Sequence, residues 1–206
     1  MSLERQLHEG IAALGLDLDT DTEARLLVYL RLLSKWNRTY NLTAIRDEAE
    51  MVSHHLLDSL TMVPYVRELD SLADVGSGAG LPGIPLAIVC PELKVTSIET
   101  VEKKVAFQQQ AKIELKLGNF SPVGARVEKT QGQFGAVTSR AFAELADFVT
   151  WSGHLLRPGG HLLAMKGIYP DEEIARLPAG WTVKTSHELK VPGLDAQRHL
   201  IVLQKN

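Results

Sequence analysis

The spacing of apolar residues changes character near residue 70. Over residues 1–70, leucines and other apolar residues recur every three or four positions, as Leu26, Leu30 and Leu33 do, and this spacing is that of one buried helix face. It predicts helices over about 3–14, from Thr20 onwards and from about Asp47 onwards. Thr20 and Glu23 have the spacing of a capping box at the start of the second helix.

After residue 70, short apolar runs alternate with helical patterns. The runs occupy residues 72–75, 95–98, 135–138 and 161–165. Strands separated by helices of this length indicate crossover connections and a parallel sheet. The helix predicted over 101–117 is expected to end with a left-handed cap at Gly118. Two further strands are predicted at 181–189 and 197–203, joined by a turn.

A glycine-rich loop follows the first predicted strand and precedes a helix. It reads Asp-Val-Gly-Ser-Gly-Ala-Gly over residues 74–80, and its glycines allow a tight turn and a close approach of the backbone to a ligand. Leu81 stands where a dinucleotide-binding loop has its third glycine, and the pyrophosphate of a dinucleotide needs a tight helix N-terminus pointed at it. The loop therefore favours S-adenosylmethionine, which has no phosphate, over NAD; an NAD-binding Rossmann protein is the alternative.

Glu99 ends the second predicted strand, where an acidic residue can accept hydrogen bonds from both ribose hydroxyls of a nucleotide. Loop and acid together predict a class I S-adenosylmethionine-dependent methyltransferase. Its fold class is α/β, Rossmann-like, with a mostly parallel seven-stranded sheet. We assign 1–68 to an N-terminal helical extension and 69–206 to the methyltransferase core, as one compact unit.

Ligands of open α/β sheets bind outside the carboxyl ends of the strands. Arg140 and Lys166 follow adjacent predicted strands and would face the transferred methyl group. Each could also be a surface charge that ends a strand. Two basic residues at neighbouring strand ends favour a substrate or anion site.

The residue types near the predicted site limit which atom can accept the methyl group. Methylation of cytosine C5 requires a cysteine nucleophile, and the single cysteine, Cys90, is expected at the far end of the helix after the glycine loop. The segment after the fourth strand, 139–142, reads Ser-Arg-Ala-Phe rather than the Asn/Asp-Pro-Pro-aromatic run of adenine amino methyltransferases. Guanine N7 needs neither device, because its lone pair is already available. No metal ligand cluster is predicted.

Several segments together match one known pattern. They are Lys-Trp-Asn-Arg-Thr-Tyr-Asn-Leu-Thr at 35–43, His-Leu-Leu-Asp-Ser at 55–59, the extended glycine loop at 74–85, Ser-Arg-Ala-Phe at 139–142 and Arg-His-Leu at 198–200. The chain resembles the bacterial 16S rRNA guanine-N7 methyltransferase family, also called glucose-inhibited division protein B. The resemblance runs from about residue 20 to the C-terminus.

The resemblance implies methylation of guanine 527, in rRNA numbering, in the 530 loop of 16S rRNA. It also implies that S-adenosylmethionine is the cofactor and that 16S rRNA or the small ribosomal subunit is the partner. The implied cofactor contacts, with those predicted from the loop, are Gly76, Gly78, Leu81, Glu99, Val127, Glu128 and Arg140. Arg140, Lys166 and Arg198 are the candidate catalytic residues, orienting the base or its phosphates. A same-fold enzyme acting on a protein or small molecule is the alternative.

Four polar residues before the sheet have two possible roles: Asn37, Asn41, His55 and Asp58 could shape the target pocket or hold the N-terminal helices on the sheet. Trp36 and Tyr40 could stack on a base, although core packing is the simpler interpretation. The lysines of the helix over 101–117 could contact rRNA phosphates or form a solvated face; they are Lys103, Lys104, Lys112 and Lys116.

Charge adds little support for RNA binding by itself. The net charge is −3, and residues 1–70 carry 7 Lys and Arg against 12 Asp and Glu. An acidic N-terminal third is compatible with an rRNA target presented on a subunit or on an assembly intermediate, rather than as naked RNA. The chain has no signal-peptide pattern and no apolar run long enough to span a membrane. We therefore expect a cytoplasmic protein, most simply a monomer.

Overall fold

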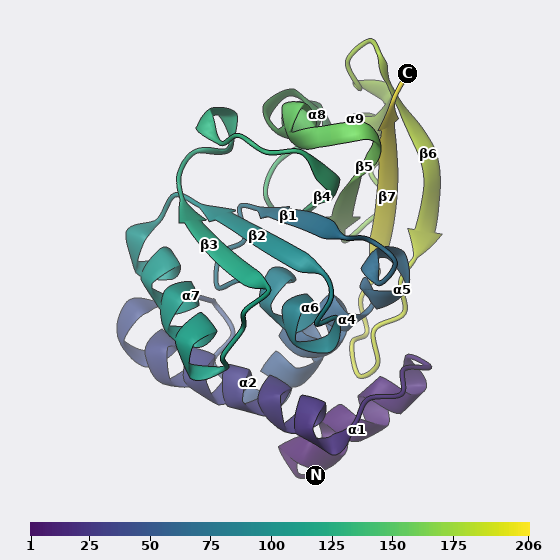
Figure 1. Cartoon of the computed structure of the whole chain (residues 1–206). Helices are drawn as coiled ribbons and strands as arrows, with labels where there is room; N and C mark the ends of the chain where they lie inside the picture. The colour runs from purple at the N-terminus through teal and green to yellow at the C-terminus, as the bar shows by residue number, and fades with distance from the viewer.

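The computed structural model describes residues 1–206. A seven-stranded sheet with strand order β3-β2-β1-β4-β5-β7-β6 runs through the middle of the molecule (Figure 1). Strands β1 to β5 pair in parallel, and β7 runs antiparallel to β5 and β6. The strands are β1 Ser71–Val75, β2 Lys94–Glu99, β3 Phe120–Gly124, β4 Phe134–Arg140, β5 Leu156–Lys166, β6 Trp181–Glu188 and β7 His199–Lys205. The predicted α/β class and seven-stranded, mostly parallel sheet are confirmed.

Strand β3 is the one that the apolar runs did not locate. It contains Ser121 and Pro122, and only Phe120 at its start is fully buried. An edge strand tolerates proline because one side of its backbone has no partner to bond. Its position at the end of the sheet therefore explains its weak hydrophobic pattern.

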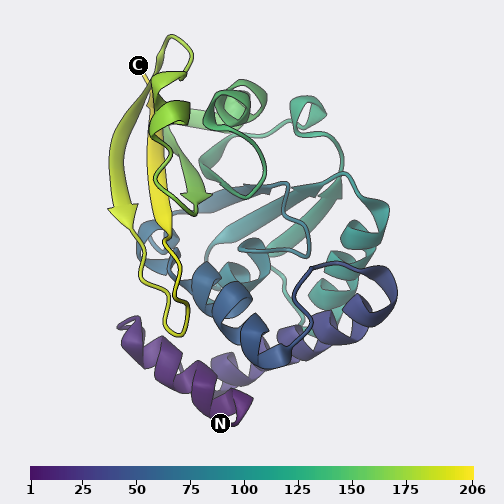
Figure 2. The ribbon, with the colours of Figure 1, turned by 180° about the vertical axis from the view of Figure 1, so that it is seen from behind.

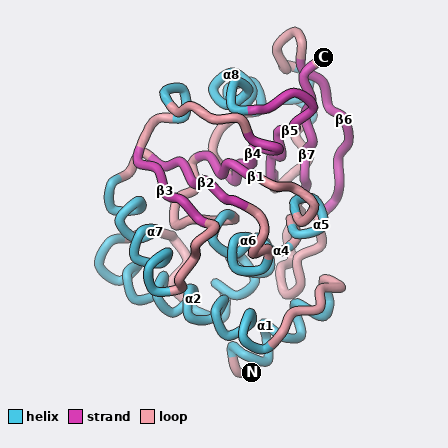
Figure 3. The backbone as a smooth tube through the Cα atoms, in the orientation of Figure 1, coloured by secondary structure: helices cyan, strands magenta, loops and turns pink.

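Helices cover both faces of the sheet (Figures 1 and 3). Helices α6 and α7 lie on one face with α2 and α1 outside them, and α8 and α9 lie on the other (Figure 2). The helices are α1 Leu3–Ala13, α2 Thr20–Tyr40, α3 Glu48–Met51, α4 Asp58–Leu60, α5 Val63–Val66, α6 Gly83–Val89, α7 Glu102–Glu114, α8 Leu145–Ser152 and α9 Asp171–Ala175. None of these helices is long and apolar enough to cross a membrane.

The alternation of side chains along the strands produces two cores. Leu72 of β1 faces α6 and α7, and its neighbour Ala73 faces α8, because successive strand residues point to opposite faces. The core on the α6 side holds 39 buried residues, including Leu7 of α1 and Leu26 of α2. The N-terminal helices therefore share a core with the sheet, across the boundary that we predicted at residue 68.

Two predicted helix ends are wrong in detail. Helix α2 is capped by Asp19 and not by Thr20, because the Asp19 carboxylate accepts a hydrogen bond of 2.7 Å from the Thr22 N–H. Helix α7 ends at Glu114, and the left-handed residue after it is Lys116, with φ 52°, rather than Gly118. In both places a neighbouring residue performs the capping role that the pattern indicated.

Candidate active site

The glycine loop joins β1 to α6 at the carboxyl edge of the sheet. Gly76, Gly78 and Gly80 all have positive φ angles, of 65°, 58° and 84°, which residues with a Cβ rarely adopt. A Cβ on Gly76 would collide with the Phe142 ring, whereas a Cβ on Gly78 would meet open space. Gly76 therefore permits a close contact within the protein, and Gly78 leaves room beside the backbone for a ligand.

A buried polar cluster holds this loop against the sheet. The Ser97 hydroxyl, on β2, donates to the Gln108 side chain of α7 at 2.7 Å. The Gln108 amide donates in turn to the Ser77 hydroxyl and to the Gly78 carbonyl, both at 2.8 Å. Sequence reasoning singled out the loop but missed Ser97 and Gln108; the available signal was Gln108, a polar residue between Phe107 and Ala111 on the buried face of its helix.

Glu99 lies at the end of β2, directly beside the loop. Its Oε2 accepts a hydrogen bond from the Gly78 N–H at 2.8 Å, and Oε1 accepts from the N–H groups of Thr100 and Val101 at 2.8 and 2.9 Å. The side chain is therefore fixed by three backbone donors. An ionised carboxylate has about four acceptor positions, so it retains capacity for a ligand hydroxyl.

A cavity of about 470 Å³ opens beside the loop and Glu99. Four of the predicted cofactor residues line it: Gly76, Glu99, Val127 and Glu128. Val127 and Glu128 come from the turn after β3, so the cavity crosses the ends of three adjacent strands. The other lining residues are Val75, Ile98, Thr100, Lys104, Ala125, Arg126, Ala141, Phe142 and Trp151.

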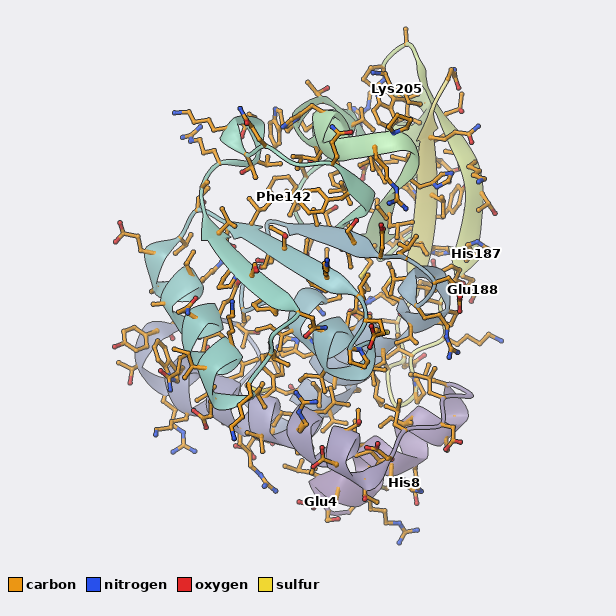
Figure 4. All side chains as sticks on the ribbon, in the orientation of Figure 1. Glu4, His8, Phe142, His187, Glu188 and Lys205 are labelled. Carbon is orange, nitrogen blue, oxygen red and sulfur yellow. The ribbon has the colours of Figure 1, made fainter.

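Two aromatic rings that the sequence did not single out for this site close one side of the cavity. Phe142 and Trp151 are 5.8 Å apart between ring centroids, in an edge-to-face arrangement. Phe142 lies above the strand ends between the sheet and α8 (Figure 4). Its neighbour Ala141 has a left-handed φ of 52°, which reverses the chain after β4. These aromatic side chains supply an apolar part of the wall of a cavity that Glu99 also lines.

Gly78, Leu81 and Arg140, the other predicted cofactor contacts, do not line this cavity. Leu81 is buried in the core on the α6 side, and its N–H donates to the Ser77 carbonyl at 2.9 Å. Its local role is to hold the turn that follows the glycines. Only a backbone contact with a ligand is compatible with this orientation.

Asp74, the last polar residue before the loop, is fully buried. Its Oδ2 accepts a hydrogen bond of 2.8 Å from the Gly83 N–H, and Oδ1 has no partner within the chain. Burial raises the pKa of this carboxyl group to about 7, while the Gly83 hydrogen bond and the Arg140 charge act in the opposite direction. The Asp74 carboxyl group thus joins the end of β1 to the start of α6, and its Oδ1 atom accepts no hydrogen bond within the chain.

Arg140 and Arg198 meet at a single carboxylate. Arg140 ends β4, and its Nη1 donates to Asp58 Oδ2 at 2.9 Å. Arg198 precedes β7, and its Nε donates to Asp58 Oδ1 at 3.1 Å. Asp58, one of the four residues left unplaced by the sequence, is 2% exposed. Two of the three candidate catalytic residues are therefore assembled around a residue of the N-terminal region.

Lys166 lies apart from this cluster. Its ammonium group donates to Glu173 Oε2 at 2.7 Å and to the Ala143 carbonyl at 2.9 Å. Glu173 also accepts from the Leu145 N–H at 2.7 Å. Lys166 thus ties the end of β5 to α9 and to the chain segment that follows Phe142.

The remaining polar residues before the sheet hold a loop in place. Asn37 donates to the Ile45 carbonyl at 3.0 Å and accepts from the Thr43 N–H at 2.9 Å, and Asn41 accepts from Arg46. The Nε2 atom of His55 lies 2.9 Å from the Thr43 hydroxyl, and Nδ1 is buried without a partner. Burial, helped by the Arg140 charge, lowers the His55 pKa to about 4. His55 is therefore neutral near pH 7.

The aromatic and lysine residues considered for RNA contact divide between core and surface. Trp36 packs on Phe107 at 5.7 Å between centroids and against the core, as expected, while Tyr40 is 43% exposed. Lys104 lines the cavity, and Lys116 lies near the opposite edge with Lys94. The three lysines of α7 and Lys116, which follows the helix, therefore do not form one patch.

Cys90 caps the C-terminal end of α6, at the amino edge of the sheet, with 8% of its surface exposed. Burial raises the pKa of its thiol, which opposes formation of a nucleophilic thiolate. Its distance from the strand ends that bear Glu99 and Arg140 agrees with a structural role. No three side chains of His, Cys, Asp or Glu lie close enough together to hold a metal ion.

Solved structures of methyltransferases share this fold. TrmN from Thermus thermophilus aligns with a TM-score of 0.59 at 16% identity, over 72% of this chain and 48% of that one, so this chain spans about half of its length. A methyltransferase from Thiobacillus denitrificans, solved with S-adenosyl-L-homocysteine, aligns with a TM-score of 0.56 at 11% identity, over 73% and 90% of the two chains. Fold and site together define a class I S-adenosylmethionine-dependent methyltransferase.

The particular family follows from sequence similarity over nearly the whole chain. The family model for rRNA small subunit methyltransferase G matches residues 22–201. The ribosomal RNA small subunit methyltransferase G of Azoarcus sp. (strain BH72) is 61% identical over 97% of this chain and 95% of its own length. The chain belongs to the rRNA small subunit methyltransferase G family, which confirms the resemblance and removes the NAD alternative.

Proposed function

We propose that this chain transfers the methyl group of S-adenosylmethionine to N7 of a guanine in 16S rRNA, guanine 527 in the 530 loop. Membership of the family supports an rRNA substrate in the small subunit. The observation that carries the guanine assignment is the pair Arg140 and Arg198, brought to one carboxylate, with Arg140 directly before Ala141, which lines the cofactor cavity. Guanidinium groups are the usual partners of the O6 and N7 edge of guanine.

The cavity suits S-adenosylmethionine in size and chemistry. Glu99 would accept a hydrogen bond from a ribose hydroxyl, because three backbone donors hold it and about one of its four acceptor positions remains free. The backbone beside Gly76 and Gly78 would lie along the amino-acid portion, since a Cβ on Gly78 would project into open space. The turn carrying Val127 and Glu128 would bind the adenine end. Phe142 and Trp151 would keep water from one side of it.

The bound cofactor supplies an electrophilic methyl group on a sulfonium, and the guanine N7 lone pair can accept it without the loss of a proton. The protein then has to align the base and exclude water. Arg140 has Nε and Nη2 and Arg198 has Nη2 without acceptors in the protein, so both can donate to the base or to flanking phosphates. We retain Lys166 as a third orienting residue, acting at the segment that it fastens through the Ala143 carbonyl.

The chemical test uses the lability of N7-methylguanosine. rRNA from a strain lacking this gene, treated with borohydride and aniline, should be cleaved at one site fewer than rRNA from the parent strain. Addition of the purified protein and S-adenosylmethionine should restore that site. Identical cleavage in the two strains would overturn the assignment. Transfer of the methyl group to an atom other than guanine N7 would also overturn it.

The state of the substrate can be tested with the same preparation. The protein would be given three substrates at equal concentration, all from the strain that lacks this gene: free 16S rRNA, an assembly intermediate and the finished small subunit. The rate of methylation of each would be measured. We propose that RNA held by ribosomal proteins is preferred, because residues 1–70 are acidic and give little general attraction for free RNA. Faster methylation of free rRNA would contradict this preference. Sedimentation of the protein alone tests the expected monomer.

A further inference from the structure

Asp58 occupies an unusual position for a carboxylate. It is 2% exposed, and each of its two oxygens accepts from a different arginine, Arg140 at 2.9 Å and Arg198 at 3.1 Å. These arginines come from β4 and from the segment before β7, which flank β5 in the sheet. Asp58 comes from the N-terminal region, 82 and 140 positions away along the chain. Three distant segments therefore meet at one buried charge.

The helix around Asp58 is also irregular. Residues Val52–Leu57 form a π-helical segment between α3 and α4, and the Asp58 N–H bonds to the Ser53 and His55 carbonyls. The carbonyl of His54, between them, accepts a hydrogen bond of 3.0 Å from Arg140 Nη1. π-Helical turns are frequent at functional sites, because they displace backbone groups from the regular ladder. The same short segment thus supplies Arg140 with both a carbonyl and a carboxylate acceptor.

The hydrogen bonds leave part of each guanidinium available. Arg140 uses only Nη1 within the protein, and Arg198 uses Nε for Asp58 and Nη1 for the Gln197 carbonyl. Their side chains are 22% and 25% exposed, whereas that of Asp58 is 2% exposed. Asp58 cannot reach a bulky substrate directly. It holds one end of each arginine, and the other end remains free to bind.

Charge balance supports the same role. Two guanidinium groups near each other repel, and each is mobile on a long side chain unless it is held. A carboxylate between them cancels one charge and fixes two directions at once, leaving one net positive charge for an RNA ligand. Removal of the carboxylate charge would leave two cations whose free ends no longer have a defined separation.

We propose that Asp58 is a positioning residue that sets the relative orientation of Arg140 and Arg198 for methyl transfer. The proposal rests on the proposed role of the two arginines at the substrate. Asp58 touches neither substrate nor cofactor and acts only through these side chains. A purely structural salt bridge would instead contribute to folding stability and have no specific coupling to the catalytic role of Arg198.

The test is a double-mutant cycle with Asp58→Asn and Arg198→Ala. The activity measured is the total transfer of tritiated methyl groups to small ribosomal subunits from the strain that lacks this gene. Asp58→Asn should lower kcat about 10- to 100-fold, while the Kd for S-adenosylmethionine by calorimetry changes less than about threefold. In the Arg198→Ala background the same substitution should have a much smaller effect, because coupled residues are not additive. Equal factors in both backgrounds, or wild-type turnover of Asp58→Asn, would overturn the proposal.

Asp70→Asn is the matched control, because it breaks the Asp70–Arg157 pair of 2.7 Å, which is exposed and lies at the amino ends of β1 and β5, at the opposite edge of the sheet from Arg140. Its kcat should equal that of the unmodified protein. Should Asp58→Asn not fold, Asp58→Glu, which keeps the charge, takes its place in the cycle with the same expected non-additivity. The assay of total methyl transfer does not depend on which atom is methylated. The cleavage mapping can therefore contradict the guanine-N7 assignment while the mutant cycle supports the role of Asp58, and the mutant cycle can contradict that role while the mapping supports guanine N7.

Discussion

Glu99 accepts a hydrogen bond of 2.8 Å from the backbone N–H of Gly78. The acid that ends β2 is thereby joined to the glycine loop that ends β1, at the edge where the cavity opens. Glu99 both shapes the loop and presents a carboxylate to the cofactor. Substitution of Glu99 should therefore weaken cofactor binding more than it lowers the free energy of unfolding.

Glu99→Gln should weaken S-adenosylmethionine binding about 10- to 100-fold, because hydrogen bonds to a charged group contribute roughly 1.5–3 kcal/mol. Calorimetric titration measures the change directly. Glu92→Gln, at an exposed position on the opposite edge, should bind as the unmodified protein does. A Kd of Glu99→Gln equal to that of the control would remove Glu99 from the cofactor site.

Gly76→Ala and Gly78→Ala should differ, although both residues have positive φ. Each substitution should cost about 1–2 kcal/mol of unfolding free energy for the left-handed backbone. Gly76→Ala should cost about 1–3 kcal/mol more, because its Cβ meets the Phe142 ring. Gly78→Ala should mainly weaken cofactor binding. Urea unfolding of the two variants decides the order, and equal losses of stability would contradict it.

Asp74 should make the protein less stable as pH rises from about 4 to about 7. Its folded pKa, about 7, lies above the ordinary value of 3.8, so in this window the folded state binds a proton that the unfolded state has lost. The fall is about 1.4 kcal/mol per pH unit. Asp74→Asn should abolish it.

His55 acts in the opposite direction in nearly the same window. Its folded pKa of about 4 lies below the ordinary 6.5, so there the unfolded state binds the extra proton and stability rises with pH. The measurement is therefore the difference in urea unfolding free energy between Asp74→Asn and the unmodified protein at pH 5, 6 and 7. A difference that does not grow with pH would show that Asp74 is ionised throughout.

Ala141→Gly should stabilise the fold by up to about 1 kcal/mol, because Ala141 has a left-handed φ of 52° that glycine adopts without strain. Methyl transfer should nevertheless become slower, since the turn between Arg140 and Phe142 loses its rigidity. Lys116→Gly is the control, with the same φ of 52° after α7. It should gain similar stability at unchanged kcat. Faster turnover by Ala141→Gly would contradict a positioning role for this turn.

Arg140→Ala should abolish most methyl transfer while thermal unfolding remains cooperative, because the core around β4 does not depend on the guanidinium.

Cys90→Ser should leave kcat unchanged, since its thiol is buried at the other edge of the sheet. Single-turnover assays with labelled cofactor measure methyl transfer by both variants. A folded but inactive Cys90→Ser enzyme would indicate a covalent mechanism.

Local sequence was sufficient for the parts of the site that lie on one loop or strand end. Glycines at 76, 78 and 80 are required by backbone geometry alone, and the apolar runs of β1, β2, β4 and β5 follow from burial on both faces. These features predicted the sheet, the loop and the position of Glu99. The same reasoning missed β3, whose edge position removes the need for a continuous apolar pattern.

Only the tertiary structure decided how the charged residues pair. Asp58, Arg140 and Arg198 lie on three segments far apart in sequence, and their contacts depend on how the N-terminal helices dock on the sheet. Lys166, which the strand pattern grouped with Arg140, pairs with Glu173 instead. Side-chain periodicity predicts which face a residue occupies, but an ion pair between distant segments follows from packing. The sequence alone determined the cofactor loop and the fold class, and the folded chain determined which acid holds which base.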